Sequence, residues 1–270
     1  MNKKIILILI TLFVFMISCV PDPLTCTRTG EVIGLVTVDL DLSSKSIRTK
    51  EAPIGNYIAD SVMEFLDNDN MSEIRLQQYF HVTGDFKVDF AIVNAGNIRH
   101  CNFSDKIEAG TDFTTGMIDE LLPFKSNVYV VQVRGDELKQ ILEHSVAKIE
   151  DTKGQFLQFS KELSITVDKT KAPEIINKIN ETESEISFPG ERIVSVKLNG
   201  NIIDDNIAIY YVATSGYIAT GGDDYLTFAE MGDEKRLDML NTYNVLLDKY
   251  IRSVIKIDPT VEGRINFVNE

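Results

Sequence analysis

Histidine, cysteine and tryptophan are scarce in this chain of 270 residues, which has three histidines, three cysteines and no tryptophan. His81, His100 and His144 form neither an H-E-x-x-H sequence nor an Asp-x-His pair, so the usual histidine patterns of metal sites are missing. The chain also lacks a G-x-S-x-G nucleophile motif and the glycine-rich sequences G-x-x-x-x-G-K-[ST] and G-x-G-x-x-G, which bind nucleotides. The sequence therefore predicts no catalytic residue, no metal ligand and no cofactor in this chain.

Positively charged residues are also few relative to negatively charged ones. The chain has 27 Lys and Arg against 41 Asp and Glu, a formal net charge of −14. Proteins that bind a nucleic-acid backbone carry clustered Lys and Arg, so this balance argues against a nucleic-acid partner. A phosphate group on a small ligand would have to be bound by a few local cations and backbone amides.

The N-terminus is the one place with a long apolar run. Lys3 and Lys4 precede an apolar stretch at residues 5–17, and Ser18-Cys19 follows it. A basic start, an apolar stretch and a small residue before a cut are the pattern of an export signal, and the stretch is shorter than the roughly 20 residues that span a membrane. The segment resembles a bacterial lipoprotein signal.

We therefore predict a signal peptide at residues 1–18, a lipid on the thiol of Cys19, a linker at 19–31 and one domain at 32–270. The mature protein would be exported and held at the membrane of the cell envelope by its lipid. An ordinary cleaved signal followed by an incidental cysteine is the alternative. Cys26 and Cys101 could pair in an oxidising compartment, or both could remain thiols.

Hydrophobic periodicity predicts an α/β (α+β) domain, a mixed β-sheet with helices packed on its faces. Asn199-Gly200 between two β-rich runs indicates a hairpin, the polar segment 169–190 is expected to be a loop, and His144, late in a helix, is expected to be solvated. Strands are expected at residues 32–42, 88–93, 128–133, 163–167, 193–203, 207–214 and 264–268, and helices at 53–66, 136–149 and 237–255.

Four segments carry side chains that core packing would not require. They contain Arg48, the run from Asn94 to Arg99, the Pro123-Phe124 loop, and an aromatic followed by a glycine-rich acidic turn at 217–225. Two arginines suit anions or ribose hydroxyls, and two aromatic rings can stack on a flat base. From the residues alone other interpretations stay open: an exposed Arg48, a core Phe124, an Asn94 that only caps a turn, and glycines that only turn the chain.

In this order, the segments resemble the C-terminal domain of the 5′-nucleotidase family. Its hallmarks are a G-N-x-x-A-D helix, an N-G-G-G-I-R turn, an L-P-F loop and a G-G-D-G turn. The matching segments are residues 55–60, 94–99, 121–124 and 221–224, with further matches at 131–143, 154–158 and 261–265. The resemblance spans residues 32 to 268.

The resemblance implies a role for each matching side chain. Phe124 and Tyr217 would hold a base between them, and Tyr217 stands where the family usually has Phe. Arg48 and Arg99 would face ribose or phosphate, whereas Asn94 would bind the base edge and Asp223 the ribose hydroxyls.

The sequence departs from the family's glycines. Ala95 and Asn97 replace two glycines of the second motif, and Asp224 replaces one in the fourth. Because glycine adopts positive φ readily and alanine does not, we expect a reshaped turn there.

The family's metallophosphatase domain, which holds two metals and cleaves the phosphate, has no match upstream of Val32. We therefore expect the nucleotide- or nucleoside-binding half of a split nucleotidase, with the divalent metals on a separate metallophosphatase chain. A non-catalytic nucleoside- or nucleotide-binding lipoprotein and a structural relic with a degraded pocket remain as alternatives.

Overall fold

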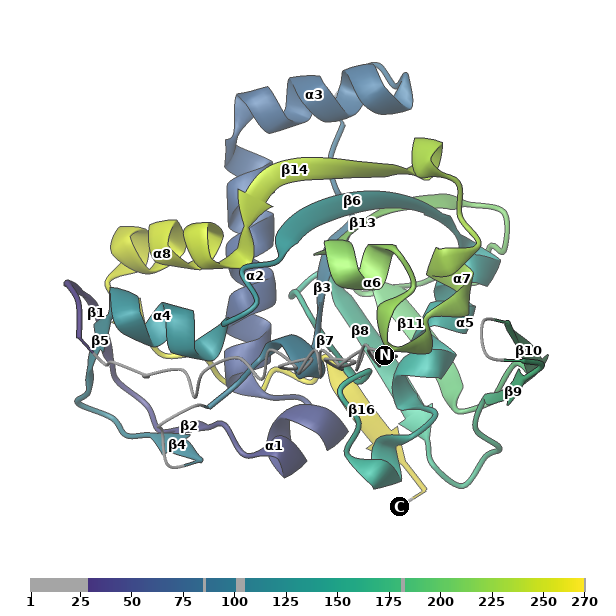
Figure 1. The fold of residues 1–270 in the computed structure, drawn as a ribbon, viewed down its shortest axis with the longest axis horizontal. Coiled ribbons are helices and arrows are strands. Elements are labelled where there is room, and N and C mark those ends of the chain that lie inside the picture. Colours follow the sequence, from purple (N-terminus) through teal and green to yellow (C-terminus); the bar gives the residue numbers. More distant parts are fainter. Residues whose placement is uncertain (1–28, 85, 101–104, 181–182, 270) are drawn as a thin grey trace, which may run out of the picture.

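The computed structural model describes residues 29–84, 86–100, 105–180 and 183–269 (Figure 1). The predicted signal peptide, Cys19, Cys26 and Cys101 lie outside these residues, so their predictions are untested. No helix in these ranges combines the length and apolar character that crossing a membrane requires.

A five-stranded mixed sheet forms the centre of the fold (Figure 1), in the order β14-β6-β13-β3-β7. Its strands are β3 (Phe90–Asn94), β6 (Asn127–Arg134), β7 (Leu157–Phe159), β13 (Ile209–Ser215) and β14 (Arg236–Thr242). Strand β3 runs parallel to β13, and the other neighbours are antiparallel. Every residue of β3 is buried, as expected for an inner strand covered on both faces.

Helix α2 (Pro53–Asn68) packs against β3, β7 and helix α8 (Tyr243–Val254). Pro53 lies in its first turn, where a missing N–H costs nothing. Ile54, Ile58 and Val62 recur every four residues and are fully or almost fully buried, so the apolar face predicted from the sequence is the face that packs.

A second sheet has the order β12-β11-β8-β16. It contains β8 (Leu163–Asp168), β11 (Ile193–Leu198), β12 (Asn201–Ile202) and β16 (Ile265–Val268). The predicted hairpin joins β11 to β12: Asn199 and Gly200 both have positive φ, 49° and 79°, as a tight turn that follows strand twist requires.

Smaller elements complete the fold. They are β1 (Val32–Val36), β2 (Leu40–Asp41), α1 (Ser44–Thr49), α3 (Asn70–Phe80), η1 (Ala95–Asn97), β4 (Lys106–Ile107), β5 (Asp112–Thr114), α4 (Thr115–Leu121), α5 (Gly135–Val146), η2 (Ile149–Asp151), β9 (Ile175–Lys178), β10 (Ser184–Phe188), α6 (Gly216–Ala219), η3 (Gly222–Asp224), α7 (Leu226–Ala229), η4 (Asp233–Lys235) and β15 (Lys256–Ile257).

Three expectations from the sequence are wrong. The polar segment 169–190 contains the antiparallel pair β9 and β10. The expected helix at 237–255 begins only at Tyr243, because residues 236–242 pair with β6 as strand β14. His144 is 3% exposed rather than solvated, since both ring nitrogens have partners inside the fold.

Several residues of the matching motifs stabilise the fold and do not line the cavity described below. Arg264 donates from both terminal nitrogens to Asp60 in α2, at 2.8 and 2.7 Å. Gln158 in β7 donates to the carbonyl oxygens of Ile47 and Lys50 at 2.7 and 2.9 Å. The two bonds from Gln158 fix the end of α1, and therefore Arg48, against the central sheet.

Candidate functional site

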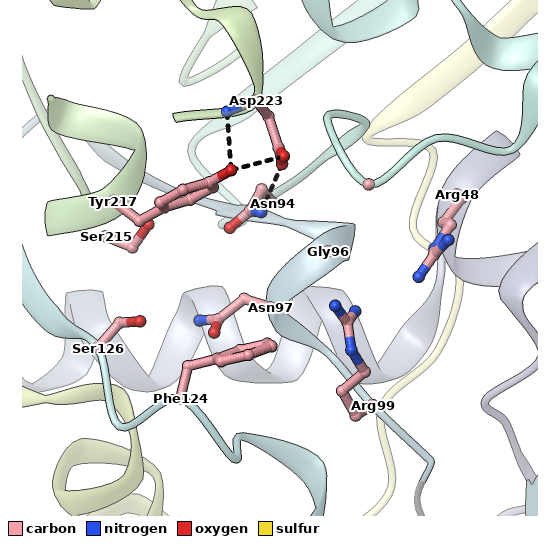
Figure 2. Close-up of a pocket in the computed structure, with 11 residues that line it drawn as sticks. Arg48, Asn94, Gly96, Asn97, Arg99, Phe124, Ser126, Ser215, Tyr217 and Asp223 are labelled. Carbon is pink, nitrogen blue, oxygen red and sulfur yellow. Dashed lines mark hydrogen bonds between the residues drawn. The ribbon is translucent and has the colours of Figure 1, made fainter. Parts of the chain in front are cut away.

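A cavity of about 480 Å³ lies at the ends of β3 and β13 (Figure 2). All six side chains singled out in the sequence line it, although they come from four segments that are far apart in the chain. The lining residues are Arg48, Asn94, Gly96, Asn97, Arg99, Phe124, Ser126, Gly154, Ser215, Tyr217 and Asp223.

Two aromatic rings face each other across this cavity (Figure 2). Phe124, in the loop after α4, is 59% exposed, and Tyr217 in α6 is 53% exposed. The alternative of a core Phe124 is therefore wrong. Large rings with so much free surface lose apolar hydration when a flat ligand enters between them, which favours stacking.

The turn after β3 forms one wall, and the residues that stand in place of its glycines are not strained there. Ala95, Gly96 and Asn97 form η1 with ordinary negative φ, so no residue there needs glycine's conformational freedom. Gly96 is required for space instead, because a Cβ on it would lie 3.2 Å from the Gly154 Cα. The Gly96 N–H donates to the Gly154 carbonyl at 2.8 Å, which holds the two backbones together.

The glycine-rich turn differs, because Asp223 and Asp224 both have positive φ, 55° and 65°. Here the family's glycine would be free of strain, and aspartate tolerates the left-handed region better than most residues. Asp224 therefore lies in a conformation that favours glycine, whereas Ala95 and Asn97 do not, and the reshaping of their turn relative to the family stays a prediction.

Asp223 is held by a small hydrogen-bond network (Figure 2). The Tyr217 hydroxyl donates to Asp223 Oδ1 at 2.9 Å and accepts from the Asp223 N–H at 3.0 Å. Asn94 Nδ2 donates to Asp223 Oδ2 at 3.1 Å. Burial, together with the neighbouring Asp223, raises the pKa of Tyr217, so its hydroxyl keeps its proton at neutral pH. A carboxylate has about four acceptor positions, so Asp223 can still accept from a ligand.

His144 supports this turn from behind. Its Nε2–H donates to the Asp223 carbonyl oxygen at 2.8 Å, and its Nδ1 contacts the carboxylate of Glu174. Tyr225 packs edge-on against the imidazole, with ring centroids 4.4 Å apart, and donates its hydroxyl to the Gln155 carbonyl at 2.6 Å. This buried cluster fixes the backbone from which Asp223 projects.

Arg48 and Arg99 point toward each other in the cavity (Figure 2), and the Arg99 guanidinium lies over the Phe124 ring, 5.1 Å from its centre. Each donates to one backbone carbonyl at 3.3 Å, and within the described ranges neither pairs with a carboxylate. Burial and the neighbouring Arg48 charge lower the pKa of Arg99. Because a guanidinium remains charged at any ordinary pH, this repulsion is relieved by an anion bound between the two.

A metal centre does not fit the residues present. Among the described residues there is no group of three or more His, Cys, Asp or Glu side chains that could hold a metal ion. The cavity offers two arginines, two asparagines and one aspartate, and therefore suits an anionic, hydrogen-bonding organic ligand.

The structure thus brings together Arg48, Asn94, Arg99, Phe124, Tyr217 and Asp223, while their roles remain predictions. Sequence reasoning missed Ser126, Ser215 and Gly154 and treated Asn97 only as a lost glycine. Ser126 lies two residues after Phe124 and Ser215 two before Tyr217, so proximity to the aromatic pair was the available signal.

The model of the 5′-nucleotidase C-terminal domain matches residues 32–230. The chain belongs to this family. It is 29% identical over 248 residues to the trifunctional nucleotide phosphoesterase YfkN of Bacillus subtilis, covering 88% of this chain and 14% of that protein. It is 28% identical to human 5′-nucleotidase, with 87% and 37% covered.

Solved structures agree on the fold. The 5′-nucleotidase precursor of Thermus thermophilus superposes with a TM-score of 0.67 and 25% identity, covering 89% of this chain and 40% of that one. The NAD nucleotidase of Haemophilus influenzae, 20% identical, has a TM-score of 0.64 over 88% of this chain and 38% of its own. This chain spans less than half the length of each of these four proteins.

Proposed function

We propose that this domain is the nucleotide-binding half of a 5′-nucleotidase-type hydrolase in extracytoplasmic nucleotide catabolism. The observation that carries the proposal is one cavity that combines two exposed, facing aromatic rings with two arginines that have no carboxylate partner in the described ranges; the Arg99 guanidinium lies 5.1 Å from the centre of the Phe124 ring (Figure 2). A nucleotide has the same two parts, a flat apolar base and an anionic phosphate.

Each group of the ligand has a matching side chain. The base stacks between Phe124 and Tyr217, and its edge meets Asn94. The ribose hydroxyls donate to Asp223, whose carboxylate is already oriented by Tyr217 and Asn94. The phosphate lies between Arg48 and Arg99, where charge-assisted hydrogen bonds to planar guanidinium groups are strong.

Phosphate cleavage is assigned to a separately made metallophosphatase chain that docks beside the cavity and supplies the divalent metals. Residues of this chain bind and orient the nucleotide, so that the scissile phosphate is presented beside the two arginines. Lipid on Cys19 would confine both exported halves to one surface and raise their effective concentration. One acyl chain binds membranes only marginally, so a stable anchor would carry more than one.

Isothermal titration calorimetry tests the binding step with AMP, adenosine and inorganic phosphate. AMP is expected to bind more tightly than adenosine, because the two arginines interact with its phosphate. Arg48→Ala should reduce the affinity for AMP and leave that for adenosine nearly unchanged. Lys178→Ala, an exposed cation of the β9–β10 hairpin, is the matched control and should change neither. No binding of AMP or adenosine at millimolar concentration would refute the nucleotide proposal.

Co-expression with a single-domain metallophosphatase from the same genome tests the catalytic partnership. The pair should release phosphate from AMP in a metal-dependent reaction that neither chain performs alone. Mixing two well-folded chains without any gain in activity would contradict the split-enzyme proposal. Retained AMP binding in that case would favour the alternative, a nucleotide-binding lipoprotein without a catalytic partner.

A further inference from the structure

Two buried amide atoms in the cavity wall have no hydrogen-bond partner among the residues that the structure describes. They are Asn94 Oδ1 and Asn97 Nδ2, on side chains of residues that are 3% and 4% exposed. A buried polar atom without a partner costs folding free energy, and native proteins keep few of them. Both residues line the cavity, so a ligand there is the available source of partners.

The orientation of Asn94 follows from its other bond. Its Nδ2 donates to Asp223 Oδ2 at 3.1 Å, so its oxygen is the atom left free. The amide of Asn94 therefore presents an acceptor to the ligand and not a donor.

Asn97 cannot move away to find another partner. Its turn is pinned by the Ala95 N–H, which donates to the Phe156 carbonyl at 2.7 Å, and by the Gly96 N–H, which donates to the Gly154 carbonyl at 2.8 Å. The backbone of Asn97 has ordinary φ, so neither strain nor a turn requires asparagine there. Figure 2 draws its side chain between Asn94 and the Phe124 ring, and all three residues line the cavity.

We propose that Asn97 is a specificity-determining residue that recognises the edge of the base by hydrogen bonding, together with Asn94. Asn97 Nδ2 donates to an acceptor on the base edge, and Asn94 Oδ1 accepts from an adjacent donor. The pair selects a base with a donor and an acceptor side by side, as in the 6-amino group of adenine and its neighbouring ring nitrogen. This inference rests on the nucleotide-binding function proposed above.

Such a site discriminates strongly, because an analogue that lacks one group leaves a buried polar atom unpaired. The same reasoning gives Asn97 an unusual signature. Replacing it removes an unpaired buried atom from the free protein and a hydrogen bond from the complex. Replacing Asn97 should therefore leave the stability of the free protein unchanged or raise it while the affinity for the ligand falls. Replacing an asparagine with a purely structural role would lower the stability instead.

The experiment measures AMP affinity by calorimetry and melting temperature without ligand for Asn97→Ala, Asn97→Asp and the wild type. Asn97→Ala should bind AMP about tenfold more weakly, the loss of one buried hydrogen bond, with an unchanged or higher Tm. Asn97→Asp, which replaces the donor by an acceptor, should bind more weakly still. Asn56→Ala is the control: Asn56 is equally buried, lies outside the cavity lining and has an Oδ1 without a partner among the described residues, but its Nδ2 donates to Glu51 and Thr260, so the Tm of this variant should fall and its AMP affinity should not.

Base analogues show which groups of the base bind to Asn94 and Asn97. Purine riboside 5′-monophosphate lacks the amino donor, and 1-deaza-AMP and 7-deaza-AMP each lack one ring acceptor. One of the two deaza analogues should bind the wild type about tenfold more weakly than AMP, and this difference should disappear in Asn97→Ala. The purine analogue should lose affinity in both proteins, since it removes the partner of Asn94.

Two results would overturn the inference and leave the nucleotide-binding function intact: equal AMP affinity of wild type and Asn97→Ala, or no discrimination by the wild type among AMP and both deaza analogues. A wild type that binds none of the nucleotides would instead refute the proposed function itself.

Discussion

Gly222 supports the Tyr217 ring, and a single methyl group added there should close the base slot. A Cβ on Gly222 would lie 2.5 to 2.6 Å from three ring atoms of Tyr217, Cζ, Cδ2 and Cε1. Because these atoms are spread around the ring, Gly222 packs on its face. Carbon atoms normally stay about 3.5–4.0 Å apart, so Gly222→Ala must displace the ring by roughly 1 Å.

The slot between Tyr217 and Phe124 has little tolerance for such a displacement. Stacking of one base on an aromatic side chain contributes about 1–3 kcal/mol, and 1.4 kcal/mol corresponds to about a tenfold change in Kd. We therefore expect Gly222→Ala to weaken AMP binding by about 5- to 150-fold, with the phosphate contacts unaffected.

Calorimetric titration of AMP into Gly222→Ala, Tyr217→Ala and the double variant is the assay. If Gly222 acts through the ring, the double variant should bind no more weakly than Tyr217→Ala alone, because the ring is already absent. Wild-type affinity in a folded Gly222→Ala protein would refute the reasoning. Additive losses in the double variant would also refute it, since they would mean that Gly222 acts on something other than Tyr217.

Three further changes have clear expected outcomes. Tyr217→Phe keeps the ring but loses both bonds to Asp223, so AMP affinity should fall about 3- to 10-fold by calorimetry, as for one or two partly exposed hydrogen bonds; tighter binding would show that the hydroxyl competes with ribose. Asp224→Gly should hold or raise the melting temperature and Asp224→Ala should lower it by a few degrees, because φ at this position is 65°. Burial raises the pKa of Asp89, so its carboxyl binds a proton more tightly in the native state than in the unfolded chain, and the native state loses stability as pH rises above about 4. Asp89→Asn keeps an acceptor for the Tyr211 N–H, so its melting temperature should exceed that of the wild type by more at pH 7 than at pH 4. An equal difference at the two pH values would contradict this sign.

Local patterns predicted the fold best where one physical cause dominated. The hairpin at Asn199-Gly200 follows from the positive φ that two adjacent turn residues must adopt. Helix α2 follows from one apolar face with Pro53 at its start. The segment from Leu237 was misjudged because leucines spaced three apart fit a helix equally well. Pairing with β6 outweighed that periodicity and made it a strand.

The burial of His144 shows a different limit. No residue near His144 in the sequence predicts its contact with Glu174, which lies 30 residues away in a segment expected to be a loop. A partner that neutralises a polar side chain is found only when the chain is folded, so burial of isolated polar residues escapes local reasoning.

By itself, the sequence determined the α/β class, the order of the family's motifs and six residues that line one cavity, because turn chemistry, apolar periodicity and motif order are local or one-dimensional properties. The tertiary structure decided which motifs hold the frame, such as Asp60 with Arg264, and which face the cavity. It also showed that Asn97 replaces a glycine without strain and that its Nδ2 has no acceptor among the described residues. Hydrogen-bond satisfaction depends on every neighbour in space, and that information exists only after folding.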